Sequence, residues 1–184
     1  MARTKAFNRD KALLRAMYLF WEQGYEATST DDLLCVMGIG RQSMYDTFGD
    51  KHRLYLEALQ HYANEFSLVP AKVPDVMASP LTVIETILLS VSEQTPGERA
   101  RGCMAVNAIS ELATRDSDVA LLMQGNESHS KTTLAKLIHE AKIKGEIDAA
   151  LDEGSAGHFL LSTLSGLRVS AKAEIGRALC RERV

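Results

Sequence analysis

Residues 28–51 restrict the fold of this chain more than any other stretch, because they carry the start and stop signals of two short helices. Thr30 is predicted to cap the first helix, since its hydroxyl can accept a hydrogen bond from an amide of the first turn. The apolar residues that follow stop at Gly38, where a helix usually ends. A second helix is predicted over residues 41–48, with Met44 and Phe48, four residues apart, on its buried face. Two short helices around a glycine-containing turn form a helix-turn-helix, whose second helix enters the major groove of DNA.

The helices on either side of this unit are expected to complete its core. Apolar residues recur at helical spacing in a predicted helix over residues 9–23. Another helix is predicted over residues 51–66, where it would also connect to the rest of the chain. Two short helices alone bury too little surface to be stable, so the flanking helices are required. We therefore expect a helix-turn-helix domain with its connecting helix in residues 1–66.

Charge is unevenly distributed along the chain. The 184 residues contain 21 Lys and Arg against 24 Asp and Glu, a formal net charge of −3. Residues 1–55 nevertheless contain 8 basic against 7 acidic residues, and the first 15 contain 5 basic residues and one acid. Because nucleic-acid binding depends on positive charge, any contact with DNA is expected at the amino end.

The remainder of the chain is also predicted to be helical. Three of the four prolines fall in residues 67–80, so the helical pattern is interrupted and a domain boundary is predicted there. Apolar residues at helical spacing then predict further helices, and no segment alternates as a strand would. The expected fold is all-α, with an N-terminal three-helix helix-turn-helix domain and a C-terminal helical domain over residues 67–173.

Residues 174–184 interrupt the apolar periodicity of the last predicted helix and are rich in arginine. They resemble translated adapter DNA fused to a truncated reading frame, so a non-native tail is expected there. A genuine short basic tail is the alternative, and an intact genomic reading frame encoding these residues would establish it.

Several functional classes are disfavoured by what the sequence lacks. No apolar run approaches the roughly 20 residues of a membrane span and no signal-peptide core is present, so a cytoplasmic protein without membrane contact is expected. Cys35, Cys103 and Cys180 are too widely spaced for a disulfide framework or a zinc site, and His129 and His139 are too isolated for a metal site. With no nucleophile motif or glycine-rich phosphate loop either, neither an enzyme nor a resident cofactor is expected.

The order of motifs in and around the predicted helix-turn-helix resembles that of the DNA-binding domain of the TetR/AcrR family of bacterial transcriptional regulators. The resemblance covers roughly residues 7–60 and rests on Gly-Tyr-Glu-Ala-Thr-Ser at 24–29, Gly-x-Gly-Arg at 38–41, and Ser-Met-Tyr-Asp-Thr-Phe-Gly-Asp-Lys at 43–51. Gly40 departs from the family pattern, in which many members have Ser or Thr as the cap of the second helix. Glycine is tolerated as a cap, with an expected cost of about a few tenths of a kcal/mol.

The resemblance implies a transcriptional repressor that a small-molecule or reactive effector releases from its operator. It also implies that the last two long helices pair with their copies in a homodimer, that the effector occupies a cavity in the second domain, and that the helix over residues 51–66 transmits the signal. Small residues in the last helix would allow the close approach of a second helix: Ser162, Ser165, Gly166 and Ser170. Two copies of a helix-turn-helix about one DNA turn apart would read a near-palindromic double-stranded operator.

The predicted DNA-binding side chains lie in or next to the helix-turn-helix. Arg41 and Gln42 begin the second helix, from which Arg can pair with guanine and Gln with adenine. Ser43 is short enough to allow close approach, whereas Asp46 would be repelled by phosphates unless a cation or a cytosine amine pairs with it. The remaining members of the set are expected to contact backbone phosphates: Thr28, Thr30, Tyr45, Thr47 and Lys51.

Cys103 is the most distinctive residue of the second domain. It is predicted at a helix N-terminus beside Arg99 and Arg101, features that favour thiol reactivity, and its segment resembles one in a TetR-like subgroup with cysteine-based electrophile sensors. A small buried residue is the alternative role. The other predicted effector-binding residues are Met104, Asn107, Glu111, Met123, Asn126, His129 and Phe159. Asn107, Glu111 and His129 are polar residues in apolar stretches, and each needs a partner that either a ligand or a helix–helix hydrogen bond would supply.

A ligand- or partner-binding helical dimer without DNA binding is the main alternative function. Asp46 and the modest positive charge of the first domain weaken the electrostatic attraction to DNA. Operator binding with a steep salt dependence would distinguish the two functions.

Overall fold

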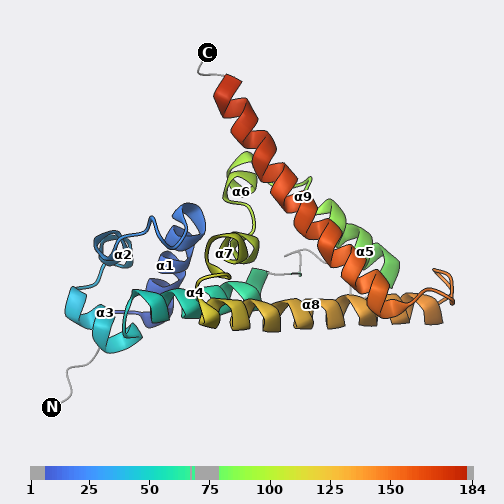
Figure 1. Ribbon diagram of the computed structural model, residues 1–184, viewed down its shortest axis with the longest axis horizontal. Helices are drawn as coiled ribbons and strands as arrows, with labels where there is room; N and C mark the ends of the chain where they lie inside the picture. The colour runs from blue at the N-terminus through green and yellow to red at the C-terminus, as the bar shows by residue number, and fades with distance from the viewer. Residues whose placement is uncertain (1–6, 67, 69–78, 182–184) are drawn as a thin grey trace.

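The computed structural model describes residues 7–66, 68 and 79–181, with side chains up to residue 173. Regular structure in these residues is helical throughout, which confirms the predicted all-α fold (Figure 1). The helices are α1 (Arg9–Gln23), α2 (Thr30–Met37), α3 (Arg41–Phe48), α4 (Lys51–Phe66), α5 (Pro80–Leu89), α6 (Pro96–Arg101), α7 (Met104–Leu112), α8 (Ser117–Ile143) and α9 (Glu153–Arg181). Most of the predicted domain boundary, and the side chains of the predicted tail at 174–184, lie outside the described residues.

Side-chain caps fix the starts of the helices near the helix-turn-helix. At α1, the Asn8 side chain accepts a hydrogen bond from Lys11 N at 2.9 Å. At α2 the cap is Ser29 rather than the predicted Thr30: the Ser29 hydroxyl accepts from Asp32 N at 3.1 Å, and the Asp32 carboxylate accepts from Ser29 N at 3.2 Å. This reciprocal pair satisfies two backbone donors, whereas a cap one residue later lacks the acidic partner.

The helix-turn-helix lies at one end of the molecule. Figure 1 shows α1, α2 and α3 gathered beside α4, while the long helices α8 and α9 meet near their connection and diverge away from it. The shorter helices α6 and α7 lie between these two arms, whereas α5 overlaps α9 in this view and contacts α8. Helix α4 contacts α1 on one side and α7 and α8 on the other. Within the described part of the chain, no helix combines the length and apolar character needed to cross a membrane.

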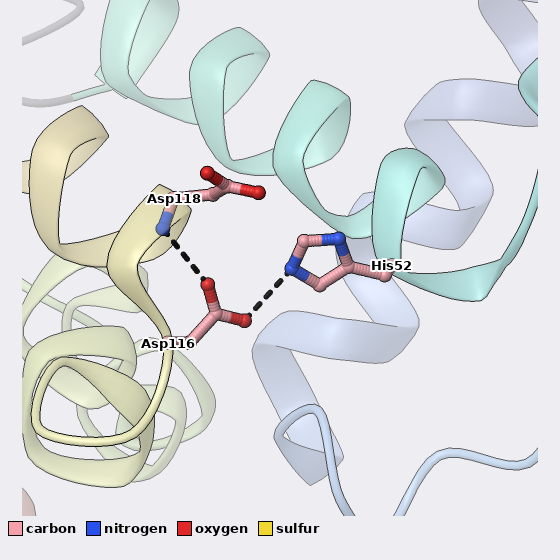
Figure 2. Close-up of side chains that lie close together, drawn as sticks. All are labelled: His52, Asp116 and Asp118. Carbon is pink, nitrogen blue, oxygen red and sulfur yellow. Dashed lines mark hydrogen bonds and ion pairs between the residues drawn. The ribbon is translucent and has the colours of Figure 1, made fainter.

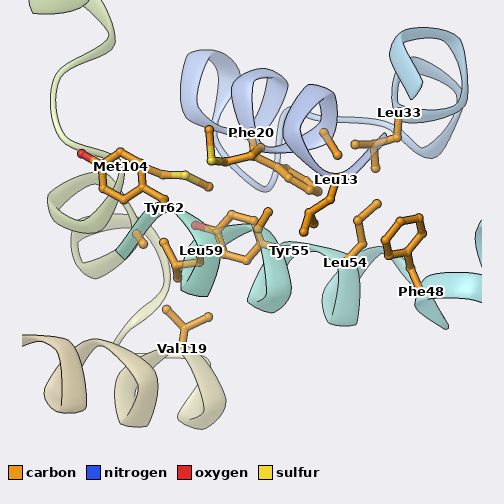
Figure 3. Close-up of a cluster of buried hydrophobic side chains, with 14 of the residues drawn as sticks. Leu13, Phe20, Leu33, Phe48, Leu54, Tyr55, Leu59, Tyr62, Met104 and Val119 are labelled. Atoms are coloured by element: carbon orange, nitrogen blue, oxygen red, sulfur yellow. The ribbon is translucent and has the colours of Figure 1, made fainter. Parts of the chain in front are cut away.

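One hydrophobic cluster extends across the predicted domain boundary (Figure 3). It joins residues of α1–α4 to residues of α7 and α8, with Leu59 and Tyr55 of α4 near its centre. Phe20 of α1 meets Tyr55 edge-on, with the two ring centroids 4.9 Å apart, and Val119 of α8 is buried on the opposite side of α4. A smaller cluster joins α5, α8 and α9 with the segment after α4: Leu68, Ile87, Val91, Leu134 and Leu164. Because the larger cluster contains α4, this helix belongs to the core of the helix-turn-helix unit and also packs against α7 and α8 of the second domain.

Leu59 tests this shared core, because it is fully buried whereas Leu89 of α5 is 52% exposed. We expect Leu59→Ala to lower the free energy of unfolding by about 2–5 kcal/mol, since the truncation leaves a cavity among packed side chains. Leu89→Ala removes the same atoms from the surface and is expected to change it by less than about 0.5 kcal/mol. Urea unfolding followed by circular dichroism measures both values, and equal losses for the two variants would contradict the shared core.

Candidate nucleic-acid interface and ligand cavity

Glycines shape the turn between α2 and α3. Gly38 ends α2 with a φ of 67°, a left-handed conformation that residues with a side chain rarely adopt. Gly40 precedes α3 in an extended conformation and supplies no side-chain hydrogen bond to that helix. Met44 and Phe48 are buried and hold the inner face of α3 on the core. The opposite face of α3 is therefore directed to solvent.

The outward face of α3 presents the residues predicted to read bases. Arg41, Gln42 and Tyr45 are exposed, and Ser43 is half-buried between them. Arg41 forms an ion pair with Asp31 of α2, which orients the guanidinium at the start of α3. An Arg and a Gln side by side at the first turn of an outward-facing helix match the hydrogen-bonding edges of guanine and adenine.

Asp46, the residue expected to disfavour DNA, is paired within α3. Gln42 Nε2 donates a hydrogen bond to Asp46 Oδ1 at 2.8 Å, four residues along the helix. The carboxylate thus has an amide partner in the same helix, which is neither of the two partners considered from the sequence, a cation or a cytosine amine.

Thr28 is buried inside the helix-turn-helix unit and is not exposed to solvent. Its side chain is fully buried, and its hydroxyl donates to the carbonyl of Gly24 at 2.6 Å. A buried hydroxyl in this position cannot reach a phosphate, which corrects the assignment of Thr28 as a DNA contact. The residue instead holds the loop between α1 and α2 in shape.

Of the other predicted phosphate contacts, Thr30 and Lys51 are partly accessible, whereas the Thr47 hydroxyl is not. Thr30 is half-buried in the first turn of α2. The Thr47 hydroxyl oxygen is buried and has no hydrogen-bond partner among the residues the structure describes. Lys51 is half-buried at the start of α4, with Nζ 4.2 Å from the centroid of the Tyr25 ring, a distance typical of a cation–π contact. Lys51 therefore lies where both the ring and a phosphate at the α4 N-terminus can contact its ammonium group.

A cavity of about 410 Å³ lies between α7, α8 and α9. Its lining residues are Cys103, Ala105, Val106, Ile109, Met123, Asn126, Glu127, Ser130, Leu161, Ser162, Ser165 and Arg168. The part lined by α7 is apolar, whereas α8 and α9 contribute most of the polar groups. This size and mixed lining are typical of small-molecule sites.

Cys103 occupies the N-cap position of α7 at one wall of this cavity. Its sulfur accepts a hydrogen bond from the Tyr62 hydroxyl at 3.5 Å and lies 3.4 Å from Arg168 Nη1. Burial, together with the neighbouring Cys103, raises the pKa of Tyr62, so its hydroxyl remains a donor. The cation next to the thiol is therefore Arg168, while the predicted neighbour Arg101 lies over two aromatic rings of α1.

Two other predicted effector residues also line the cavity, whereas nine of its twelve lining residues were not predicted. Met123 and Asn126 face the same space as Cys103. Arg168 and Ser130 are additions that the sequence analysis missed. The available signal for Arg168 was a single cation within a stretch of small and apolar residues of the last helix.

Five of the predicted effector residues are not among those that line this cavity, and three of these five are Met104, His129 and Phe159. Met104 is buried in the core shared with α4, and Phe159 is 69% exposed on α9. His129 lines a separate hollow between α4 and α8, which it shares with Asn126. The structure therefore does not bring these side chains together with Cys103.

Asn107 and Glu111 have protein partners instead of a ligand. Asn107 donates to the carbonyl of Arg101 at 3.0 Å and accepts from Lys172 Nζ at 3.1 Å. Both oxygens of the Glu111 carboxylate accept hydrogen bonds from the main chain of the loop before α2. Their polar groups are satisfied by contacts between helices and loops, the alternative that the sequence left open.

His52, Asp116 and Asp118 cluster where α4 meets the start of α8, with possible metal-ligand atoms within 4.8 Å of one another (Figure 2). Asp116 Oδ2 bonds to His52 Nε2 at 2.7 Å, while Oδ1 accepts from Asp118 N at 3.0 Å and Val119 N at 3.1 Å. Burial acts to raise the pKa of Asp116, but the hydrogen bonds from Val119, His52 and Asp118 lower it overall. The arrangement is that of a helix cap joined to α4, with both carboxylate oxygens engaged.

The fold and the exposed face of α3 define a helical DNA-binding protein of the helix-turn-helix class, with a ligand-sized cavity in its second half. The chain belongs to the TetR family of bacterial transcriptional regulators. The family model described as "Bacterial regulatory proteins, tetR family" matches residues 13–58. As a member of this family, the chain is a transcriptional regulator rather than an enzyme, as predicted.

Known relatives support the same membership over most of the chain. The HTH-type transcriptional repressor ComR of Escherichia coli (strain K12) is 29% identical over 178 residues, which are 92% of this chain and 82% of ComR. The HTH-type transcriptional regulator YezE of Bacillus subtilis (strain 168) is 33% identical over 152 residues, 80% of this chain and 77% of YezE. A cysteine mutant of the TetR family regulator CifR, complexed with 26-base-pair double-strand operator DNA, matches with a TM-score of 0.79 and 30% identity, covering 99% of this chain and 97% of that one.

Arg41 provides a direct test of the candidate interface. We expect Arg41→Ala to weaken binding to a selected operator duplex by about 1–3 kcal/mol, because a base-reading guanidinium is lost. Folding should be unchanged, since Arg41 is exposed. Fluorescence anisotropy with a labelled duplex measures the affinity, and Lys144→Ala, an exposed cation after α8, is the matched control. An affinity equal to that of the control at the same salt concentration would count against the assignment.

Proposed function

We propose that the chain is a homodimeric repressor that binds a near-palindromic double-stranded DNA operator and is released from it by a small-molecule or reactive effector. The observation that carries this proposal is the outward face of α3, where Arg41 and Gln42 are exposed while Met44 and Phe48 anchor the helix to the core. The relatives named repressors, and the CifR complex with operator DNA, support the same assignment. Operator binding would also locate the protein in the cytoplasm.

The roles of individual side chains follow from their position on the interface. Arg41 is assigned to a guanine edge and Gln42 to an adenine edge, with Ser43 allowing close approach of α3 to the groove. Tyr45 and Lys51 are assigned to backbone phosphates, because Tyr45 is exposed on α3 and Lys51 is the first, partly accessible residue of α4. Thr30 stays in the proposed set as a further phosphate contact, whereas Thr47, whose hydroxyl is buried, would contact a phosphate only after its side chain turns outward.

Two copies are proposed to associate through α8 and α9. Large apolar side chains are exposed along these two helices, and exposed apolar surface is typical of an interaction site. They are Leu121, Ile143, Phe159, Leu167 and Val169. Gly125 and Gly166 have open space where a side chain would be, which would allow close approach of a partner helix. A dimer of this kind would hold two copies of α3 about 34 Å apart, the spacing of one DNA turn.

The effector is proposed to enter the cavity between α7, α8 and α9. Its apolar wall would bind the body of a small molecule, while Asn126, Ser130 and Arg168 would bind polar groups. Cys103 gives the same cavity a nucleophilic sulfur beside a guanidinium, which suits a reactive effector. Release would be a population shift toward a conformation in which the two recognition helices are wrongly spaced.

The division into a DNA-binding domain at residues 1–66 and an effector and dimerisation domain at 67–173 is retained as part of this proposal. The two units differ in role although the α4 core joins them. A ligand- or partner-binding dimer without DNA binding remains the competing function, and the DNA selection described next discriminates between the two.

Selection of DNA from a random pool is expected to yield a near-palindromic sequence with two half-sites. Binding to the selected duplex should weaken steeply as salt rises, because cationic side chains release counterions from the phosphates. Affinity is measured by anisotropy over a salt series, with a scrambled duplex as the control. Equal affinity for selected and scrambled duplexes would favour the competing function.

Cys103 can be tested with N-ethylmaleimide, a thiol-specific electrophile. We expect treatment to lower the operator affinity of a Cys35→Ser variant by about tenfold or more, within the usual range of allosteric coupling. Addition of Cys103→Ser to that background should abolish the effect, because the cavity then lacks its nucleophile. The exposed Cys35 is removed in both proteins, so that modification at the helix-turn-helix cannot cause release. Equal release from the two variants would exclude Cys103 as the reactive residue.

A further inference from the structure

Glu111 links the cavity domain to the loop that precedes the recognition unit. We propose that Glu111 is a positioning residue, which couples movement of α7 at the cavity to the helix-turn-helix. This inference rests on the proposed release of the operator by an effector in the cavity, and it names the contact that carries the signal. It assigns to α7 a role that the sequence analysis gave to α4.

The carboxylate of Glu111 accepts hydrogen bonds from main-chain amides rather than from side chains. Oε2 accepts from Tyr25 N at 3.1 Å, and Oε1 accepts from Glu26 N at 2.8 Å. Hydrogen bonds between a charged acceptor and backbone amides are among the stronger ones in proteins. Because two successive amides point to the two oxygens, the path of the loop is fixed relative to α7.

The loop is shaped around this carboxylate at Gly24. Gly24 ends α1 with a φ of +84°, and a Cβ at this position would lie 2.8 Å from Glu111 Oε2. Four residues later, the hydroxyl of Thr28 donates back to the Gly24 carbonyl, and Ser29 then caps α2. The contact made by Glu111 is therefore continuous with the start of the helix-turn-helix.

Helix α7 is bonded to the DNA-binding unit at both of its ends. Just before its start, the carbonyl of Gly102, the residue that ends α6, accepts a hydrogen bond from Trp21 Nε1 of α1 at 2.9 Å. At its end, Glu111 holds the loop between α1 and α2. Between these two points Val106 and Ile109 face the cavity. A ligand that displaces the cavity wall formed by α7 therefore moves Glu111, and with it the loop that leads to α2.

A cavity-filling substitution can replace the unidentified effector in the test. Ser165 of α9, which the sequence analysis assigned to helix pairing, lines the cavity, so Ser165→Phe places an aromatic ring in the space assigned to the ligand. Size-exclusion chromatography of each variant checks that a change in operator affinity does not come from loss of the dimer. We expect Ser165→Phe to weaken binding to the selected operator duplex by about tenfold or more in the otherwise wild-type chain. In a Glu111→Ala background the same substitution should change affinity by less than about threefold, because the coupling contact is missing. Glu140→Ala, which removes an exposed glutamate of α8, is the matched control background and should preserve the full effect.

The outcomes separate the inference from the function on which it rests. No effect of Ser165→Phe in the wild-type chain contradicts release through the cavity, and the role of Glu111 falls with it. A full effect in both the wild-type and Glu111→Ala backgrounds leaves release through the cavity intact and overturns the role of Glu111.

Two further measurements separate coupling from a loss of folding. Glu111→Gln keeps one acceptor oxygen and is expected to show an intermediate effect, which maintains the test if Glu111→Ala fails to fold. Hydrogen exchange at the Tyr25 and Glu26 amides should accelerate in the Glu111 variants while protection within α4 is unchanged. Uniform loss of protection would indicate a purely structural role and contradict the inference.

Discussion

Burial of α4 from two sides is the constraint on which the rest of the structure depends. Tyr55, Leu59 and Tyr62 give this one helix two sets of partners, α1 on one side and α7 with α8 on the other. Two domains joined by a flexible linker are usually free to reorient. Here the connecting helix belongs to both cores, so the orientation of α3 depends on packing in the whole molecule. Coupling between cavity and interface then needs only small shifts within a continuous core.

Much of the helix-turn-helix is predictable because its signals act within one or two helical turns. Gly24 and Gly38 end helices with positive φ angles, and the apolar spacing of α3 correctly predicts Met44 and Phe48 as its anchors. The cap of α2 is harder, because two adjacent hydroxyls compete for the same role. Of these two, Ser29 alone has an acidic residue three positions later, and that reciprocal pair decides the outcome.

The side chains of the second domain are less predictable because their partners are distant in sequence. A polar residue in an apolar stretch does signal a need for a partner, and Glu111 has one, but that partner is main chain 85 residues away. Arg168 lies beside Cys103 although 65 residues separate them, so no local spacing relates the two. The prediction for Thr28 is wrong for a different reason. Its place beside a DNA-binding motif suggests a phosphate contact, but its hydroxyl donates to the carbonyl of Gly24 within the fold.

The hydrogen bond between Trp21 and Gly102 has a spectroscopic consequence. Trp21 is the single tryptophan of the chain. Its indole projects from α1 and donates a hydrogen bond to the carbonyl of Gly102, the residue that precedes Cys103. The guanidinium of Arg101 is 5.1 Å from the centroid of the same ring. Indole emission responds to hydrogen bonding and to nearby charge, and no second indole contributes background. The native chain therefore carries an optical probe at the junction of its two units, without any label.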